Sequence, residues 1–585
     1  MKQLFMIAAG ACMIASCTGN ATEQSQKKSK NFHDYTERFT LQLWKQFPGF
    51  GSAMGFHACD SVLPIPDEQT RLADDAFAKA HLDSLNAFEL SDLSDNDRTD
   101  YLMIRNYLQS VIWSNDTEKA WQWNPSQYNV CERFAEILNG SYSTLEARLR
   151  SISVRLGNVP AYYEAARKNI LNPTREHTQL AIDQNTGGAS VFEKDLPEKI
   201  RASQLDSSEK TAMLDKCRNA AEAIRDFAAW LKSNPNPQPR SFRLGRELYQ
   251  QKFAYEIQSG SSLETMHERA LARKRELHGL MFSTAQKLWP AYMGSKVAPR
   301  DSLQLIRQVI DKISLNHTTP DSFQATIEKQ IPELVAFVNR KQLITLDPSK
   351  PLVVRREPDY MAGVAGASIS APGPYDKNGN TYYNVGSLSG WPADKAESYL
   401  REYNRYTLQI LNIHEAIPGH YTQLVYANQS PSIIKSIFGS GTMIEGWAVY
   451  TERMMLENGY GAPEGSNEAT PEMWLMYYKW NLRSTCNFLL DYGVHTAELS
   501  EEAAMKLLTE EAFQQKAEAE GKWKRVSVTQ VQLCCYFTGF SEIYSLREEM
   551  KQKQGTAFSL KQFHEQFLSY GSAPVKYIRE MMIRK

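Results

Sequence analysis

The sequence has no excess charge of either sign, few cysteines and no long apolar run in its main body. Among 585 residues, Lys and Arg number 66 and Asp and Glu number 67, so the net charge gives no sign of a nucleic-acid partner. The eight cysteines include no CxxC pair, which argues against a zinc cluster held by cysteines, and their spacing indicates no disulfide framework. Beyond the N-terminus no stretch approaches the length of a membrane span, so we expect a soluble body of undetermined oligomeric state.

The N-terminus has the pattern of an export signal. A positive residue precedes the apolar run Leu4–Ala15, which has the length of a signal-peptide core and is too short to cross a bilayer. The run ends at Ile14-Ala15-Ser16-Cys17, which resembles the bacterial lipobox, in which the Cys is lipidated and becomes the first mature residue. An ordinary signal peptide that happens to contain a Cys is the alternative. We therefore expect residues 1–17 to be a lipoprotein signal, residues 18–32 a flexible tether, and the protein to be anchored by Cys17 in the cell envelope, on a membrane face that the sequence does not specify.

In most of the remaining chain, apolar residues recur at three- and four-residue intervals, a pattern that predicts amphipathic helices. A Pro- and Asn-rich break at Ser233–Arg240 is the best boundary between an N-terminal helical region, residues 33–240, and a second region, residues 241–585, which carries the motifs described below. Both regions are expected to form one continuous family domain. The predicted helices are Asp97–Trp113, Ser143–Leu171, Ser208–Ser233, Leu263–Leu288, Asp394–Leu411, Pro471–Asp491 and Ser527–Lys551.

One segment, Leu352–Leu388, is poor in helix signal and rich in Gly, Pro, Ser and Tyr. Within it, Ser368–Ser370 and Thr381–Leu388 alternate as short strands do, and the turn Asp376–Asn380 separates them. We therefore expect a small hairpin whose edge strand, through Tyr382, Tyr383 and Asn384, could align a peptide substrate by strand addition. A surface hairpin without a role is the alternative.

The segment from His414 to His420, HEAIPGH, holds the ingredients of a hydrolytic zinc site. Neutral imidazoles bind zinc, and the adjacent Glu415 can take a proton from metal-bound water. In the usual HExxH pattern the second His is at i+4 and shares a helix face with the first, whereas here it is at i+6, about 120° away on an ideal helix. Pro418 and Gly419 could break the helix and bring the rings together. The alternative is one core His and one surface His at a helix end.

A second element, EGWAVYTE, begins 25 residues beyond His420, at Glu445. Glu445 and Glu452 are seven residues apart, so they lie on one face of a predicted helix among apolar residues. Two carboxylates on such a face are costly to bury without partners, and a metal ion or a His N–H would be a suitable partner. We assign Glu445 as the third ligand and Glu452 as the residue that orients a ligand. Two alternatives remain open. The two residues could have the reverse roles, or both could be surface glutamates.

The string HEAIPGH followed by EGWAVYTE resembles the bacterial family named domain of unknown function 885, whose members are regarded as zincin-like metallopeptidases. The resemblance extends over nearly the whole mature chain. At Gln530-Val531 the sequence departs from the Pro-Gly of the family pattern, which puts the start of the following helix in doubt. The other residues that match the family pattern are Pro48, Gly55, His57, Asp60, Leu244, Gly245, Tyr249, Tyr382, Tyr383, Asn384, Arg483, Asp491, Gly493, His495, Gln532, Tyr536, Gly539, Leu546, Arg547, His564, Gly571 and Pro574.

The resemblance implies a large, predominantly α-helical, gluzincin-type metallopeptidase with one Zn²⁺ per chain and a small hairpin near a cleft. It implies hydrolysis of peptide bonds, by analogy in short peptides, with Glu415 as general base. Such enzymes need a neutral donor for the oxyanion, and Tyr536, with His495 as partner or alternate, would supply it. A core Tyr and a structural His are the alternatives. A catalytically silent surface protein that binds peptides or glycans, and a zinc hydrolase of esters or non-peptide amides, are the competing functions.

Overall fold

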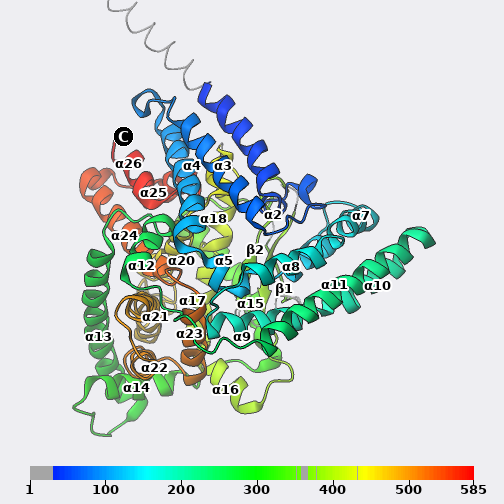
Figure 1. Ribbon diagram of the computed structural model, residues 1–585. Helices are drawn as coiled ribbons and strands as arrows, with labels where there is room; N and C mark the ends of the chain where they lie inside the picture. The colour runs from blue at the N-terminus through cyan, green and yellow to red at the C-terminus, as the bar shows by residue number, and fades with distance from the viewer. Residues whose placement is uncertain (1–30, 351, 358–366, 377–378, 431, 585) are drawn as a thin grey trace, which may run out of the picture.

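The computed structural model describes residues 31–350, 352–357, 367–376, 379–430 and 432–584. The export signal, Cys17 and most of the tether therefore lie outside the described residues. The described part is predominantly helical, with one small sheet (Figure 1). Among its helices, none combines the length and apolar character that a bilayer crossing requires.

A helix over residues 31–46 opens the fold. The helices that follow in the first half are α2 Pro48–Ala53, α3 Glu68–Leu85, α4 Asp95–Trp113, α5 Ala120–Trp123, α6 Cys131–Asn139, α7 Leu145–Leu156, α8 Val159–Asn169, α9 Arg175–Gly188, α10 Leu196–Ala202, α11 Ser207–Ser233 and α12 Arg246–Glu256. Those of the second half are α13 Leu263–Met293, α14 Ser302–Ile313, α15 Phe323–Lys341, α16 Ala393–Glu402, α17 Arg405–Glu415, α18 His420–Ala427, α19 Ile433–Ile437, α20 Gly441–Glu457, α21 Pro471–Thr496, α22 Glu501–Lys506, α23 Lys516–Val528, α24 Cys534–Gln554, α25 Leu560–Ser569 and α26 Val575–Arg584.

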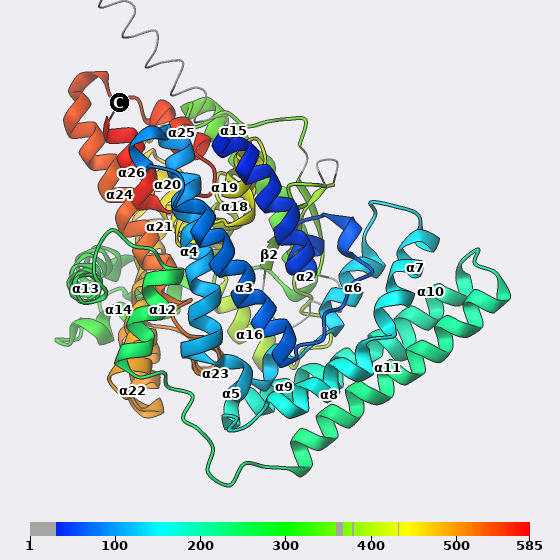
Figure 2. The ribbon, with the colours of Figure 1, turned by 45° about the horizontal axis from the view of Figure 1, so that its top comes forward.

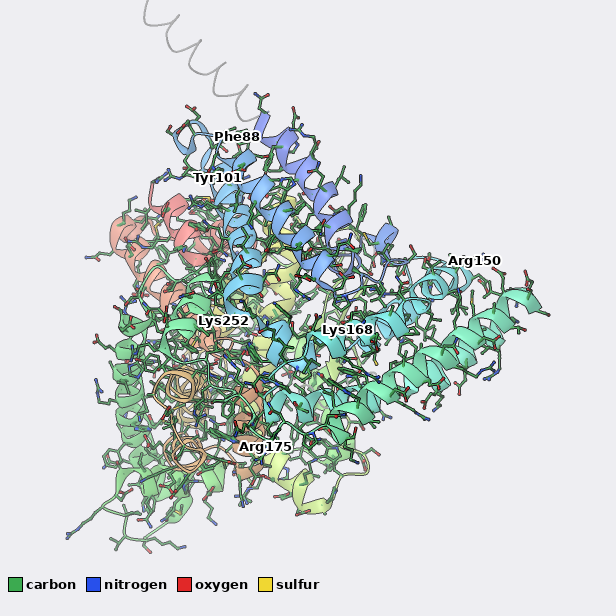
Figure 3. All side chains as sticks on the ribbon, in the orientation of Figure 1. Phe88, Tyr101, Arg150, Lys168, Arg175 and Lys252 are labelled. Carbon is green, nitrogen blue, oxygen red and sulfur yellow. The ribbon has the colours of Figure 1, made fainter. Side chains whose placement is uncertain are left out.

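The helices are organised around one large core and several smaller ones. The large core joins the first helix, α3 and α4 to most of the helices from α13 onward, and at one end Phe32 packs against Phe88 and Tyr101 (Figure 3). A separate core lies within α6–α11, which form an arm that projects from the body (Figures 1 and 2). The predicted boundary at Ser233–Arg240 falls where α11 and the arm end. The first three long helices thus share a core with helices of the second half of the chain, whereas the arm has its own.

Three predicted helices were wrong in their extent, each for a local reason. The predicted helix Ser143–Leu171 is two helices, because the chain turns at Gly157 and Asn158 before Pro160 enters the first turn of α8. The predicted helix Asp394–Leu411 is divided between α16 and α17 at Asn404, whose side chain caps α17 by accepting from the N–H groups of Tyr406 and Thr407. The third, Ser527–Lys551, begins later, at Cys534 in α24.

The sheet has the strand order β1-β3-β2, from β1 Leu352–Arg356, β2 Ala367–Ser370 and β3 Thr381–Val385. Strands β2 and β3 pair antiparallel, which confirms the predicted hairpin, and β1 pairs parallel to β3. The prediction that Tyr382–Asn384 is an edge strand was wrong, because β1 pairs with its other side. Within the described residues the sheet edges belong to β1 and β2, and β2 lies against α17.

Candidate metal centre

The turn between α17 and α18 brings the two predicted histidines together. Helix α17 ends at Glu415, the peptide bond between Ile417 and Pro418 is cis, and α18 begins at His420. The chain folds back so tightly that a Cβ at Gly419 would overlap the carbonyl oxygen of His414. Only glycine therefore fits at this position, and the two imidazole rings lie nearly perpendicular with centroids 4.8 Å apart.

The carboxylate of Glu445 on α20 completes a cluster with the two histidines. Its Oε2 lies 3.6 Å from His414 Nε2 and 3.4 Å from His420 Nε2. One ligand atom from each residue lies within 4.8 Å of the others, which is a spacing that could hold a metal ion. Glu445 Oε2 is buried and has no hydrogen-bond partner among the described residues, although the side chain as a whole is 20% exposed. A buried carboxylate oxygen without a partner is costly, so the geometry fits a cation between the three groups.

Glu452, two turns along α20 from Glu445, lies behind His414. Its fully buried Oε1 accepts a hydrogen bond from His414 Nδ1 at 2.7 Å and a second from the indole N–H of Trp480 at 3.0 Å. Because Nδ1 donates to Glu452, Nε2 is the ring nitrogen that faces Glu445, and it could bind a metal ion once its proton is lost. This is how a carboxylate orients a metal-binding imidazole.

The buried charged groups of the cluster shift one another's pKa values. Burial raises the pKa of Glu445, but attraction to the two imidazoles outweighs burial and the pKa is lowered. Burial lowers the pKa of His414, yet the carboxylates of Glu445 and Glu452 raise it to about 10. For Glu415 burial dominates and raises the pKa, with the two imidazoles opposing the shift. A carboxylate with a raised pKa beside the cluster is suited to taking up and releasing a proton.

Helix α24 places Tyr536 beside the cluster because it packs very closely against α20. The close approach occurs at Gly446 and Gly539, where a Cβ on either residue would overlap the backbone of the other helix. Burial and the neighbouring Glu445 carboxylate raise the pKa of Tyr536 to about 12, so its hydroxyl stays protonated. Arg525 on α23 donates a hydrogen bond to the Tyr536 oxygen at 3.3 Å, and the Gln532 side chain is a second polar neighbour of the same hydroxyl.

His495 lies in a different network from the cluster. Its buried ring stacks on Tyr249, and Nε2 lies 2.9 Å from the carbonyl oxygen of Val526. None of its described contacts is with the three clustered residues. The neighbouring Asp491 accepts from the backbone N–H groups of Val531 and Leu533. These contacts fix the end of α23 and the start of α24, the helices that carry Arg525 and Tyr536.

Two of the three sheet residues predicted to bind substrate are buried. Tyr383 is fully buried and donates a hydrogen bond to Asn412 on α17 at 2.7 Å, which ties the central strand to the metal-site helix. Asn384 is also fully buried. Its side-chain amide accepts a hydrogen bond from Arg355 on β1 and donates one to Ser370 on β2. Tyr382 is half-buried, with the Arg355 guanidinium 3.8 Å above its ring.

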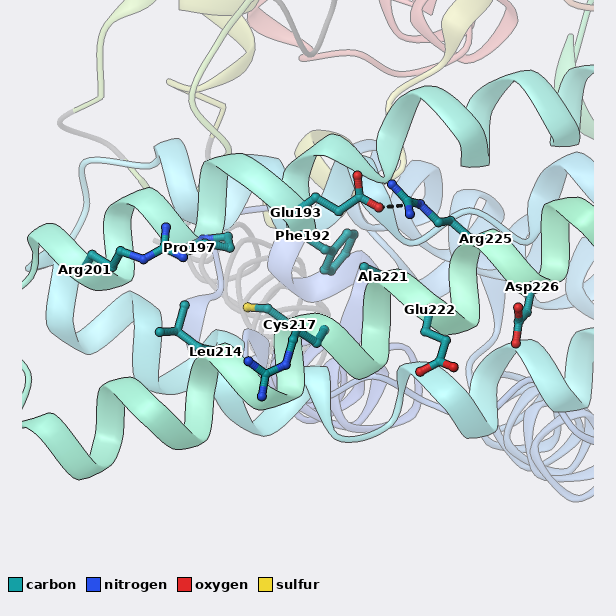
Figure 4. Close-up of a pocket in the computed structure, with 11 residues that line it drawn as sticks. Phe192, Glu193, Pro197, Arg201, Leu214, Cys217, Ala221, Glu222, Arg225 and Asp226 are labelled. Carbon is teal, nitrogen blue, oxygen red and sulfur yellow. Dashed lines mark ion pairs between the residues drawn. The ribbon is translucent and has the colours of Figure 1, made fainter.

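A hollow of about 550 Å³ lies far from this cluster, between α10 and α11 on the arm (Figure 4). Its lining includes Cys217 and the ion pair between Arg225 and Glu193, with N and O 2.6 Å apart. None of its lining residues belongs to the cluster, so this hollow is not part of the candidate metal centre.

Several residues around the site were not predicted from sequence. Trp480, Arg525 and Asn412 contact Glu452, Tyr536 and Tyr383, respectively, and the partners of each pair lie on different elements, 28, 11 and 29 residues apart. No spacing rule connects such positions. The Gly446–Gly539 contact had one available signal, which is a glycine inside each of two apolar helices.

Comparison with known proteins defines the class to which this chain belongs. Residues 48–582 match the family described as "Bacterial protein of unknown function (DUF885)", and the chain belongs to that family. A structure of a candidate lipoprotein of unknown function from Shewanella oneidensis is 51% identical and covers 94% of this chain and 99% of its own, with a TM-score of 0.85. A candidate lipoprotein from Colwellia psychrerythraea is 17% identical over 96% of this chain and 99% of its own, with a TM-score of 0.76, and shares the fold. Among curated proteins, none matches this chain.

Proposed function

We propose that this protein is a zinc-dependent peptidase that cleaves short peptides, with His414, His420 and Glu445 as ligands of one Zn²⁺ per chain. The observation that carries the proposal is the convergence of two imidazole nitrogens and one carboxylate oxygen within 4.8 Å of one another. Two His and one Glu are a ligand set of catalytic zinc sites, in which one position stays open for water or substrate. The buried, unpartnered Oε2 of Glu445 supports this assignment.

In the proposed mechanism the residues of the chain position the substrate and move protons. A zinc ion in the cluster would supply Lewis-acid chemistry, polarising the scissile carbonyl and lowering the pKa of water. Glu415 takes the proton of the attacking water and delivers it to the leaving amine, a role that its raised pKa supports. The Tyr536 hydroxyl donates a hydrogen bond to the oxyanion that develops on the carbonyl. His495 contributes indirectly, because its contacts hold the segment between Arg525 and Tyr536.

The sheet supports an extended peptide in this proposal. Strand β2 lies against α17, which carries His414 and Glu415, and its outer edge has no strand partner among the described residues. An extended peptide can hydrogen-bond to such an edge as an added strand. In this proposal β2, and not Tyr382–Asn384 on β3, aligns the peptide. Tyr383 stabilises the sheet through its hydrogen bond to Asn412 on α17.

The anchoring of the protein is a second part of the proposal. The lipobox at Cys17, together with two structural neighbours described as candidate lipoproteins, supports an exported protein held to a membrane by lipid on Cys17. Cys17→Ala should release the protein from the membrane fraction and abolish labelling by a fatty-acid probe. Unchanged fractionation of this variant would contradict the anchor.

The peptidase proposal is tested with purified protein and a pool of internally quenched peptides. Cleavage should stop on chelation and return when zinc is added back. Glu415→Gln, which removes the base and leaves the ligands, should keep its zinc and lose about 10²- to 10⁴-fold in kcat. Cleavage by Glu415→Gln at the parent rate would refute the mechanism, and peptide binding without any turnover by the parent would identify a binding protein.

A further inference from the structure

Four basic side chains gather beside the metal centre, and within the described residues two carboxylates form ion pairs with them. The cationic cluster consists of Lys479 and Arg483 on α21 and Lys522 and Arg525 on α23. Lys479 pairs with Glu402 at 2.8 Å, and Arg483 pairs with Glu518. Arg525 has neutral partners, the side chains of Gln532 and Tyr536. The cationic cluster therefore has more basic groups than carboxylates that pair with them.

Lys522 lacks a close anionic partner among the described residues. Its side chain is 4% exposed, and its single described ion pair is to Glu518 Oε1 at 3.8 Å, beyond hydrogen-bond distance. That carboxylate already bonds the guanidinium of Arg483. Burial and the neighbouring Arg483 lower the pKa of Lys522 to about 7. A buried ammonium without a close anion is unfavourable, so this position is suited to receive an anion from outside the chain.

Three contacts place the cationic cluster next to the metal centre. Arg525 donates a hydrogen bond to Tyr536, and the Glu445 carboxylate raises the pKa of the Tyr536 hydroxyl. Arg483 stacks at 4.6 Å on the ring of Trp480, which donates to Glu452.

The third contact runs through Tyr403, on the side of Glu415. The ring of Tyr403 packs 6.1 Å from Trp480 and lies within the electrostatic reach of both Arg483 and Glu415. The cationic cluster is thus one side chain away from the third ligand, from the residue behind His414 and from the proposed base. Helices α17, α20, α21 and α23, which carry these groups, meet in the middle of the body (Figure 1).

We propose that the cationic cluster binds a carboxylate of the peptide substrate, by preference the free carboxylate at its C-terminal end, so that cleavage occurs close to that end. The inference rests on the proposed function and specifies its substrate. Arg525 offers a planar donor pair that matches a carboxylate, and Lys522 offers a point charge. An acidic side chain near the scissile bond presents the same group, so the experiment distinguishes these two sources.

The test measures peptide binding in a Glu415→Gln background, in which turnover is disabled. The probes are fluorescein-labelled, alanine-rich pentapeptides with identical sequences that end in a free acid or in an amide. A third probe has the amide end and a Glu as its last residue. Lys522→Met and Arg525→Gln are the test variants, and Lys524→Gln, an exposed cation on the same helix, is the matched control.

We expect the free acid to bind about tenfold more tightly than the amide, the usual effect of one charge-assisted contact. Lys522→Met and Arg525→Gln should remove most of that preference, and Lys524→Gln should keep it. Equal binding of the two probes, or a preference that persists in both test variants, would overturn the inference. Equal binding of the free acid and the Glu-ending amide would assign the site to carboxylates in general and refute the terminal preference.

The result of this binding test can be distinguished from the result of the peptidase test. A preference for the free acid together with no hydrolysis by protein that retains Glu415 would refute the peptidase and leave a carboxylate-binding site. Thermal stability provides a further check, because Lys522 makes no hydrogen-bonded ion pair. Lys522→Met should melt no lower than the parent, whereas a structural ion-pair role predicts a clear loss of stability.

Discussion

At the scale of single residues, the candidate site consists of three side chains that each direct one ligand atom toward the other two. His414 illustrates this, because the hydrogen bond from Nδ1 to Glu452 leaves Nε2 to face Glu445. The same reasoning separates Glu445 from Glu452. Glu445 Oε2 faces the Nε2 atoms of both imidazoles, whereas Glu452 Oε1 accepts hydrogen bonds from His414 Nδ1 and from Trp480.

This division of roles gives a prediction for Glu452. Glu452→Gln keeps the volume of the side chain and removes the charge that orients His414, so zinc affinity should fall about 10- to 100-fold without being abolished. Competition with a chromophoric zinc chelator measures the change. A loss as complete as that of a direct ligand would show that Glu452 binds the metal itself.

Tyr536 gives a second prediction at this scale. Tyr536→Phe removes the hydroxyl and keeps the ring packed between α23 and α24, so folding and zinc content should be unchanged. The kcat for peptide hydrolysis should fall about 10²- to 10³-fold, because an oxyanion donor is lost, with little change in KM. Steady-state kinetics measure both constants, and an unaltered kcat would exclude Tyr536 as the donor.

At the scale of elements, the sequence could predict the helix break between His414 and His420 but not every helix boundary. The i+6 spacing and Pro418-Gly419 already indicated a helix break, which the structure contains between α17 and α18. Strand β1 was missed because its partner, β3, lies about 30 residues further along the chain, and such pairing depends on tertiary contacts. Val531 explains the late start of α24. It occupies the glycine position of the family pattern, has a left-handed φ of 70°, and is held by Asp491.

The tight turn gives the prediction for this scale. Gly419→Ala introduces a Cβ that overlaps the His414 carbonyl, so α18 must shift and carry His420 away from the cluster. The variant should lose most of its zinc although every ligand is intact. Gly279→Ala is the matched control, because nothing lies within 4 Å of its Cβ position in α13 and the helix should gain about 0.5–1 kcal/mol. Full zinc occupancy in Gly419→Ala would show that the turn does not position His420.

At the scale of the whole molecule, a buried histidine joins the arm to the body. His177 on α9 is fully buried, and its ring bonds Thr174 and the carbonyl oxygen of Val528 at the end of α23. Burial, opposed in part by the Val528 carbonyl, lowers the pKa of His177 to about 4. The folded protein therefore keeps this ring neutral at pH values where the unfolded chain would protonate it.

This shift predicts an acid-sensitive stability. Because the folded pKa lies below the unfolded value near 6.5, the stabilisation is complete above about pH 6.5 and is lost as the pH falls toward 4. The slope should approach about 1.4 kcal/mol per pH unit. His177→Gln should melt lower than the parent at pH 7.5 and show a smaller drop between pH 7.5 and 5, whereas the exposed His33→Gln should behave as the parent. Identical pH dependence in His177→Gln and the parent would contradict this account.

The measurement that tests the central claim most directly is the metal content of purified ligand variants. After zinc loading and removal of excess metal, the parent should hold about one zinc per chain by elemental analysis. His414→Ala, His420→Ala and Glu445→Ala should each hold almost none, because two protein ligands are too few for firm binding. His33→Ala should match the parent. A parent that binds no zinc, or a His420→Ala variant that retains a full equivalent, would contradict the proposed metal centre.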